Sequence, residues 1–243
     1  MPFHPTQIGR GLVERDGEAY VLTVPPAEKS AYHDAQLSTY LRRDAFDCSP
    51  PLVLTIRARF DGDIRGTAGF GFWNHPYAPN ERHFSLPRAL WFFYGSPPNN
   101  MPLAKGVAGH GWKAGVFDAT RPLFYALVPF APFAFVMMRV PFLYRALWGL
   151  GQRAIGVDEC ALDESLMADF HDYTIDWRKD RVIFSVDGAV VLDTPRSPKG
   201  ALGFVAWIDN QYAVVTPQGN FGFGLIDVPS PQKLIIESLD IVK

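Results

Sequence analysis

Few polar residues of this chain are spaced for acid–base or metal chemistry. His75, Glu81 and His83 lie within nine residues of one another, but they occupy a loop-like stretch and match no zinc-binding pattern. His110 follows a glycine-rich stretch, and Asp209 ends a late apolar segment. His75, His110 and Asp209 are therefore only weak candidates for a general acid or base, and no metal site or cofactor is predicted.

The elements that must position such residues are predicted to be short β-strands. Tyr173, Ile175 and Trp177 alternate with polar residues, the period of a half-buried strand. Asp187-Gly188 then supplies the dipeptide that a tight hairpin prefers. Similar patterns predict strands over residues 20–24, 52–60, 66–73, 88–95, 107–119, 182–192, 200–209, 212–216, 221–226 and 234–242. Residues 1–17 are expected to be irregular, whereas residues 28–36 and 158–167 are expected to contain short helical turns.

The bulk composition fits one all-β domain spanning residues 1–243. Sandwiches commonly reach about 200 to 250 residues as one unit, and 21 Gly with 21 Pro suit many turns and few long helices. The strand at residues 66–73 contains Gly69 and Gly71 between Phe70 and Phe72. Its bare backbone predicts either the close approach of a ligand or the packing of aromatic rings over glycine.

The segment 170–188 also carries a family resemblance. Its pattern F-H-x-Y-x-x-x-W-x-x-D-x-x-x-F-x-V-D-G resembles the back-sheet hairpin of glycoside hydrolase family 16 and related concanavalin A-like proteins. LIIESLDIVK, at residues 234–243, is similar to the strand that closes those domains. The resemblance covers roughly residues 35–243 and implies a two-sheet antiparallel jelly-roll sandwich. Some relatives hold a structural calcium ion on the convex face, and the resemblance leaves such an ion open here.

The catalytic pattern of the family is missing. Retaining glycosidases use two carboxyl groups about 5 Å apart, which family 16 places on one strand as E-x-D-x-E or E-x-D-x-x-E. Laid on residues 88–95, this pattern puts Ala89 at the first Glu, Trp91 at the Asp, and Phe93 or Tyr94 at the second Glu. Glycoside hydrolysis is therefore not expected.

Three functions remain open at this point. The first is a non-hydrolytic protein whose aromatic cleft binds an apolar small molecule or a glycan. Its expected ligand-binding residues are Trp73, Ala89, Trp91, Phe93, Tyr94, Trp207, Asp209 and Asn210. The second is an enzyme of another class that uses His75, His110 or Asp209. The third is a membrane-peripheral or assembly protein that docks through residues 121–155.

Residues 121–155 form an apolar insertion with an unusual charge pattern. No acidic residue lies between Asp118 and Asp158, whereas the insertion contains Arg121, Arg139, Arg145 and Arg153. Its uncharged run, residues 122–138, has three prolines and is shorter than the roughly 20 residues that span a bilayer. Residues 142–155 predict an amphipathic helix. The insertion is expected to be a lid on an apolar pocket in preference to an anionic-membrane contact, with simple packing on the sandwich as the alternative.

Charge and cysteine content exclude other classes. The net charge of -2 argues against a nucleic-acid-binding protein, which usually has a basic excess. Cys48 and Cys160 are too few for a disulfide framework. Because residues 1–20 lack the apolar core of a secretory signal, the chain is expected to be cytoplasmic, or peripheral to a membrane through its insertion.

Overall fold

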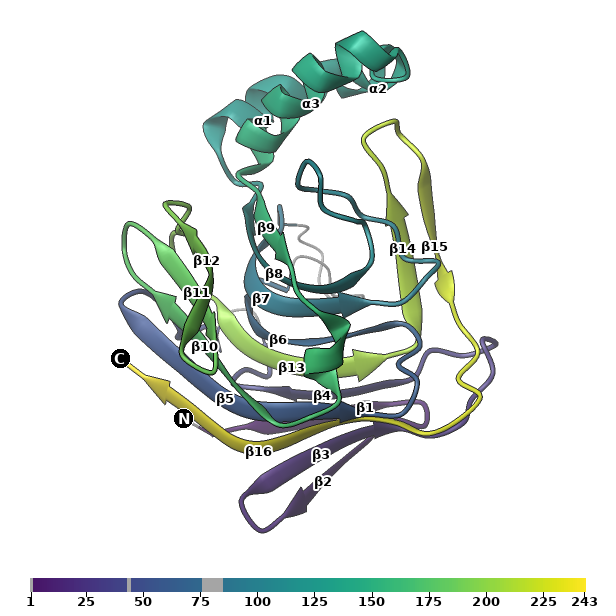
Figure 1. Ribbon diagram of the computed structural model, residues 1–243, viewed down its shortest axis with the longest axis vertical. Helices are drawn as coiled ribbons and strands as arrows, with labels where there is room; N and C mark the ends of the chain where they lie inside the picture. Colours follow the sequence, from purple (N-terminus) through teal and green to yellow (C-terminus); the bar gives the residue numbers. More distant parts are fainter. Residues whose placement is uncertain (1, 43–44, 76–84) are drawn as a thin grey trace.

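The computed structural model describes residues 2–42, 45–75 and 85–243. Two antiparallel sheets of seven strands each pack face to face (Figure 1). Sheet I has the order β1-β4-β13-β6-β7-β8-β9, and sheet II has the order β12-β11-β10-β5-β16-β3-β2. The fold is therefore the predicted two-sheet antiparallel sandwich.

Sheet I comprises β1 (His4–Ile8), β4 (Asp34–Ser38), β13 (Gly203–Asp209), β6 (Thr67–Trp73), β7 (Arg88–Gly95), β8 (Gly111–Asp118) and β9 (Asp158–Ala161). Sheet II comprises β12 (Ala189–Thr194), β11 (Val182–Val186), β10 (His171–Trp177), β5 (Leu52–Asp61), β16 (Gln232–Val242), β3 (Ala19–Val24) and β2 (Leu12–Asp16). A separate hairpin joins β14 (Gln211–Val215) to β15 (Phe221–Leu225). The helical elements are α1 (Pro122–Leu127), η2 (Val128–Phe130), α2 (Ala131–Met137), α3 (Pro141–Ile155) and η3 (Glu164–Met167).

The meander of β10, β11 and β12 forms as its sequence predicts. Asp187 and Gly188 connect β11 to β12 with φ angles of 49° and 77°, the left-handed backbone that a two-residue hairpin of this kind requires. Tyr173, Ile175 and Trp177 are all buried. Alternation along the strand therefore identified the side that packs into the sandwich.

Two sequence expectations were wrong, and a third was right in part. Residues 1–17 form β1 and β2, and the segment expected to be helical near residues 28–36 instead enters β4. β4 lies between β1 and β13, so its backbone N–H and C=O groups form hydrogen bonds with a strand on each side. This pairing outweighs the helical preference of the local sequence. Residues 158–167 divide into β9 and the short η3 turn, because β9 pairs with β8 at the edge of sheet I.

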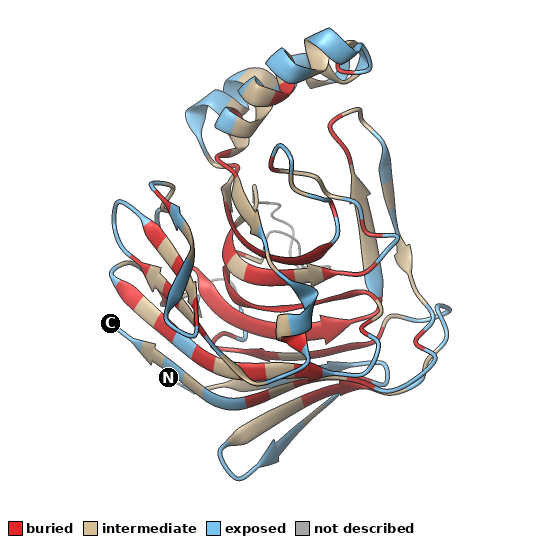
Figure 2. Cartoon of the chain, in the orientation of Figure 1, coloured by how far each residue is buried: buried red, intermediate tan, exposed pale blue. Residues whose placement is uncertain are grey.

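Aromatic rings join the two sheets. Phe92 of β7 packs against Phe70, Trp112, Tyr173 and Phe184, with ring centroids 5.6, 6.0, 5.0 and 5.3 Å away. Tyr173 and Phe184 belong to sheet II, whereas the other rings belong to sheet I. All five side chains are fully buried, and Figure 2 shows the buried residues gathered in the strands of both sheets. Phe92 is thus at the centre of the core.

The insertion is helical and stands at one end of the sandwich (Figure 1). Its prolines begin helices, since each helical element has Pro within its first two positions, where the missing N–H costs no hydrogen bond. The expected helix over residues 142–155 is α3, which ends at Gly156 with a φ of 62°. None of the helices in the described part of the chain is both long and apolar enough to cross a membrane.

Replacing Phe92 with Ala tests the role of this residue in the core. We expect the free energy of unfolding to fall by about 3 to 5 kcal/mol, because the substitution leaves a cavity between the sheets. Phe223→Ala removes the same ring from a position that is 75% exposed and should change stability by less than about 0.5 kcal/mol. Denaturant titration measures both values, and equal stabilities of the two variants would contradict this assignment.

Candidate functional site

The central strand of the candidate site is β7, which lies between β6 and β8 in sheet I. Its register with both neighbours is continuous, so alternate side chains point to opposite faces. Leu90 and Phe92 enter the main core. Ala89, Trp91 and Phe93 therefore point to the outer face of sheet I, the face turned away from sheet II.

Five aromatic side chains form one cluster on this outer face: Trp73, Trp91, Phe93, Phe117 and Trp207. The ring of Trp91 lies at the centre, 5.4 Å from Phe93 and Trp207, 5.5 Å from Phe117 and 6.3 Å from Trp73. Phe93 and Trp207 are each 8% exposed, whereas Trp73, Trp91 and Phe117 are half-buried. The accessible part of this aromatic cluster is therefore formed by these last three rings.

The glycines of β6 permit this packing. A Cβ atom on Gly69 would lie 3.0 Å from the ring of Trp207, and one on Gly71 would lie 2.7 Å from Cβ of Trp91. Both would also meet carbonyl oxygens of β7 at 2.2 to 2.3 Å. Of the two sequence interpretations, the structure supports aromatic packing over glycine.

His75 is held beside the aromatic cluster. Its ring stacks on Trp73 with centroids 4.9 Å apart and an interplanar angle of 23°. The indole N–H of Trp73 donates to the Tyr40 hydroxyl, and that hydroxyl lies 3.4 Å from Nδ1 of His75. This contact orients Trp73 at the rim of the cluster. Glu81 and His83, the other members of the polar loop, lie outside the described residues.

The remaining expected site residues add no accessible side chain to the aromatic cluster. Tyr94 packs against the main core, because β7 has no bulge that would turn it outward. Asn210 is fully buried and bonds to the backbone of His33, Ala31 and Ile226. His110 is exposed just before β8. Ala89 is on the outer face but only 1% exposed.

Asp209 is a buried structural acid. Its Oδ1 accepts hydrogen bonds from the backbone N–H and hydroxyl of Thr67, at 3.1 and 3.0 Å, and from the backbone N–H of Gln211 at 3.0 Å. Burial raises the pKa of Asp209 to about 7, although these hydrogen bonds lower it. The pKa of its cross-strand neighbour Asp34 is also raised, by burial and then by the charge of Asp209. Asp209 therefore fastens β13 to β6.

A buried ion pair at the other side of the outer face was not anticipated. Nζ of Lys113 lies 3.5 Å from Oε1 of Glu159 and donates to the carbonyl of Ala108 at 2.9 Å. Oε2 of Glu159 accepts the backbone N–H of Ala104 at 3.0 Å. Burial raises the pKa of Glu159, whereas Lys113 lowers it. Phe117 was also missed, although its alternation with Lys113 and Gly115 along one strand indicated a shared face.

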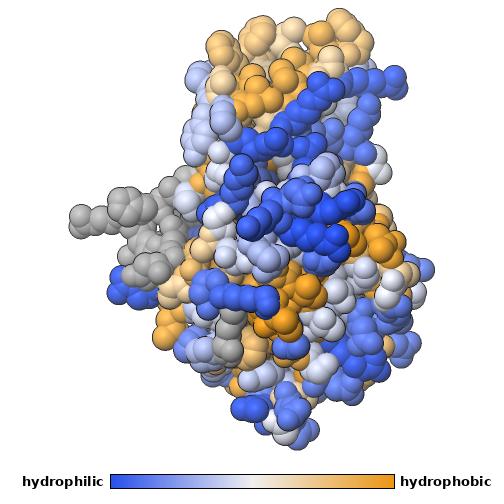
Figure 3. Space-filling view, turned by 90° about the vertical axis from the view of Figure 1, so that its left-hand side faces the viewer, coloured by the Kyte–Doolittle hydropathy of each residue, from blue (hydrophilic) through white to orange (hydrophobic). Residues whose placement is uncertain are grey.

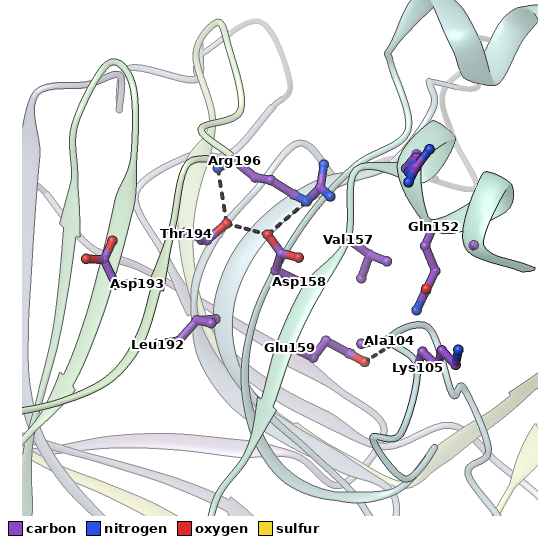
Figure 4. A pocket seen from close by; sticks show the side chains of 12 residues that line it. Ala104, Lys105, Gln152, Val157, Asp158, Glu159, Leu192, Asp193, Thr194 and Arg196 are labelled. Atoms are coloured by element: carbon purple, nitrogen blue, oxygen red, sulfur yellow. Dashed lines mark hydrogen bonds and ion pairs between the residues drawn. The ribbon is translucent and has the colours of Figure 1, made fainter.

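A polar cavity of about 580 Å³ opens beside Glu159, between β9, β12 and the end of α3 (Figure 4). Nε of Arg196 lies 2.8 Å from Oδ2 of Asp158, and the Thr194 hydroxyl donates to the same carboxylate oxygen. Figure 4 shows both side chains directed at Asp158. Among the charged residues that line this cavity, Asp158 and Arg196 pair with each other, and Glu159 and Asp193 pair with Lys113 and Arg181 outside it.

Within the described residues, β7 contributes no carboxyl group to the outer face. Asp34, Asp209 and Glu159 lie on the outer face. Asp34 and Asp209 are buried, and Asp209 and Glu159 are held by hydrogen bonds to their neighbours. The family pattern falls on Ala89, Trp91 and Phe93, which can neither donate a proton nor attack a sugar. No group of three or more His, Cys, Asp or Glu side chains suited to a metal ion occurs among residues 2–42, 45–75 and 85–243.

Comparisons with known proteins identify the fold. The family model described as glycosyl hydrolases family 16 matches residues 145–209. An endo-β-galactosidase from Clostridium perfringens superimposes with a TM-score of 0.55 at 10% identity, over 95% of this chain and 53% of its own. A laminarinase from Flavobacterium sp. UMI-01 gives 0.51 at 14% identity, over 95% and 81%. The chain has the fold of glycoside hydrolase family 16.

Another structural neighbour with this family 16 fold is described as a pseudo β-1,3-glucanase and immunostimulatory antigen of Mycobacterium tuberculosis. It gives a TM-score of 0.50 at 11% identity, over 93% of this chain and 75% of its own. No curated protein sequence matches the chain. At these identities the comparisons establish the fold, and the chemistry depends on the residues of this chain.

The pH dependence of stability should reveal the state of Asp209. Its folded pKa of about 7 lies above the ordinary value of 3.8, so the folded state keeps a proton that the unfolded state loses. Stability should therefore fall as pH rises from about 4 to 7. In Asp209→Asn, the free energy of unfolding measured with denaturant should fall less across this pH range, and the fall that remains should come from Asp34. An unchanged pH profile would contradict the assignment.

Proposed function

We propose that this protein binds a glycan without hydrolysing it, on the aromatic cluster of the outer face of sheet I. The observation that carries the proposal is the cluster of aromatic rings around Trp91 on the outer face of β7, the strand on which we expect the family pattern to fall at Ala89, Trp91 and Phe93. The faces of aromatic rings stack on the apolar faces of sugars. The strand that supplies catalytic acids in the family thus supplies a binding surface here.

The position of the half-buried rings supports a surface for an extended ligand. Trp73 and Phe117 lie in one cross-strand row on either side of Ala89, and Trp91 lies in the next row. Adjacent strands are about 4.8 Å apart, so rings on β6, β7 and β8 span the width of more than one sugar unit. The packed rings of Phe93 and Trp207 support Trp91 from below, which reduces the entropy lost when a ligand binds.

Two neighbours provide the ligand class. The laminarinase and a mixed linkage glucan family 16 protein of Bacteroides ovatus, seen in complex with its product, align over 95% and 99% of this chain. We therefore propose a β-glucan or related glycan as the ligand. An apolar small molecule is the second candidate, because Phe93, Val205, Trp207 and Met101 form an apolar cluster of their own. Of the acid–base candidates, His75 stacks on Trp73 at the rim of the cluster, whereas Asp209 is fixed by hydrogen bonds to Thr67 and Gln211 and His110 is exposed just before β8. One histidine beside the rings supports enzymatic chemistry of another class less than the rings themselves support binding.

Hydrolysis of β-glucans should be absent. Purified protein incubated with laminarin or lichenan should release no more reducing sugar than a blank, because a double displacement needs two carboxyl groups in the cleft. Release of reducing sugar that is abolished by Asp34→Asn or Glu159→Gln would show that one of these buried acids is catalytic.

Trp91→Ala should weaken glycan binding at least about tenfold, equivalent to about 1.4 kcal/mol, because Trp91 contacts every other ring of the cluster. Isothermal titration with laminarin and mixed-linkage oligosaccharides measures the loss. Phe223→Ala, which removes an exposed ring from β15, is the matched control and should bind as the wild type does. If oligosaccharides do not bind, but an apolar dye binds and is released by Trp91→Ala, the ligand is the apolar molecule instead.

A further inference from the structure

The helices of residues 121–155 expose an unusual amount of apolar surface. α1, η2 and α2 bury no residue, and α3 buries only Trp148 and Ala154. The exposed side chains are Leu123, Tyr125, Val128, Phe130, Phe133, Val136, Val140, Phe142 and Leu150. Figure 3 shows hydrophobic colour gathered over this end of the molecule. Patches of this kind mark interaction sites on soluble proteins.

The β14–β15 hairpin extends this surface. The rings of Phe135 and Phe221 lie 5.6 Å apart in an edge-to-face contact, and Gly219 packs against the same Phe135 side chain. Phe221 and Phe223 are themselves exposed. We call the exposed apolar side chains of residues 121–155, together with these two rings, the apical surface.

The ring contacts of the described residues do not connect the apical surface to the aromatic cluster. No ring contact joins an aromatic residue of the insertion to Trp73, Trp91, Phe93, Phe117 or Trp207 within the described chain. The carbonyl of Leu103 accepts a hydrogen bond from the Gln152 side chain at 3.2 Å, which ties α3 to the loop before β8. The contacts therefore do not support the expected lid, and the apolar side chains of the insertion face outward.

Unpaired positive charge accompanies the exposed rings. Arg121, Arg139, Arg145 and Arg153 are all exposed, and no ion pair connects them to an acidic residue of the described chain. A hollow of about 820 Å³ lies between Arg139 and Arg145, and Met138, Pro141, Phe142, Tyr144 and Gln218 also line it. Two guanidinium groups beside an apolar lining suit a phosphate group that is attached to a lipid.

Charge complementarity distinguishes a lipid surface from a second copy of the chain. A two-fold dimer would place each apical surface against its own copy, so arginines would face arginines without an acidic side chain between positions 118 and 158 to pair with them. An anionic bilayer supplies the missing negative charge and accepts apolar side chains at its interface. The side chains of Phe133 and Phe142 are 69% and 75% exposed and can insert into the bilayer interface.

We propose that the apical surface docks this protein on an anionic phospholipid membrane, with a headgroup phosphate held between Arg139 and Arg145. Phe133, Phe142 and the neighbouring apolar side chains enter the interface. The arginines are attracted to the negatively charged membrane, and their contribution to binding decreases as salt is added because salt screens the lipid charge. This docking is independent of the glycan-binding proposal, since the two surfaces share no residue.

Co-sedimentation with vesicles tests the docking. Wild-type protein should sediment with vesicles that contain phosphatidylglycerol, bind far less to phosphatidylcholine alone, and lose binding as salt is raised. Arg139→Glu/Arg145→Glu should weaken binding at least about tenfold, given about 1 kcal/mol for each basic residue at the surface. Phe133→Ser/Phe142→Ser keeps the arginines and should also lose most binding. Arg15→Glu/Lys179→Glu makes the same change in net charge on other exposed residues and should retain wild-type binding.

Several results would overturn the proposal. Absence of binding to the anionic vesicles would do so, as would equal losses in the Arg139/Arg145 variant and the Arg15/Lys179 control. A dimer in light scattering that dissociates in Phe133→Ser/Phe142→Ser, without vesicle binding by the wild type, would assign the surface to a second copy. Circular dichroism spectra that match the wild type establish that each variant is folded.

Discussion

The structure depends on the packing of β7, which contacts the core between the two sheets with one face and forms the aromatic cluster with the other. Phe92 joins sheet I to sheet II through rings on four other strands, and this contact fixes which face of β7 is buried. Because side chains alternate along a strand, it also fixes the direction of Trp91 and Phe93. The core therefore determines the position of the aromatic cluster, and the glycines of β6 allow its rings to approach the backbone.

Much of the sandwich could be predicted because its inner strands alternate clearly. β5, β10 and β16 carry apolar residues at every second position, whereas β7 is a short continuous apolar run, so period and length indicated strands. β1 and β2 were missed because they are short, polar and largely exposed, and they exist through backbone pairing with their neighbours. α1 and α2 were not anticipated individually because their prolines resemble breaks in the sequence, whereas in the structure they begin helices.

The site was predictable only in part. Trp73, Trp91, Phe93 and Trp207 come together because the order of strands in the family fold places their segments side by side. Tyr94 was assigned to the cleft because sequence alone does not show whether a strand contains a bulge. Asp209 and Asn210 resembled ligand-binding residues at a strand end, but their hydrogen bonds to Thr67, Gln211 and nearby backbone groups show that they secure loops. The Lys113–Glu159 pair depends on long-range contact and has no local signal.

The six tryptophans of the chain offer the most direct measurement of the central claim, that the outer face of sheet I binds the glycan. Trp73, Trp91 and Trp207 belong to the cluster, whereas Trp112 and Trp177 lie in the core and Trp148 lies in the insertion. Their indole N–H signals can be followed by NMR during titration with a β-glucan oligosaccharide. We expect saturable shifts for the three cluster tryptophans and little change for the other three, which would place the glycan on this face. Shifts confined to Trp148, or no shifts at saturating oligosaccharide, would contradict it.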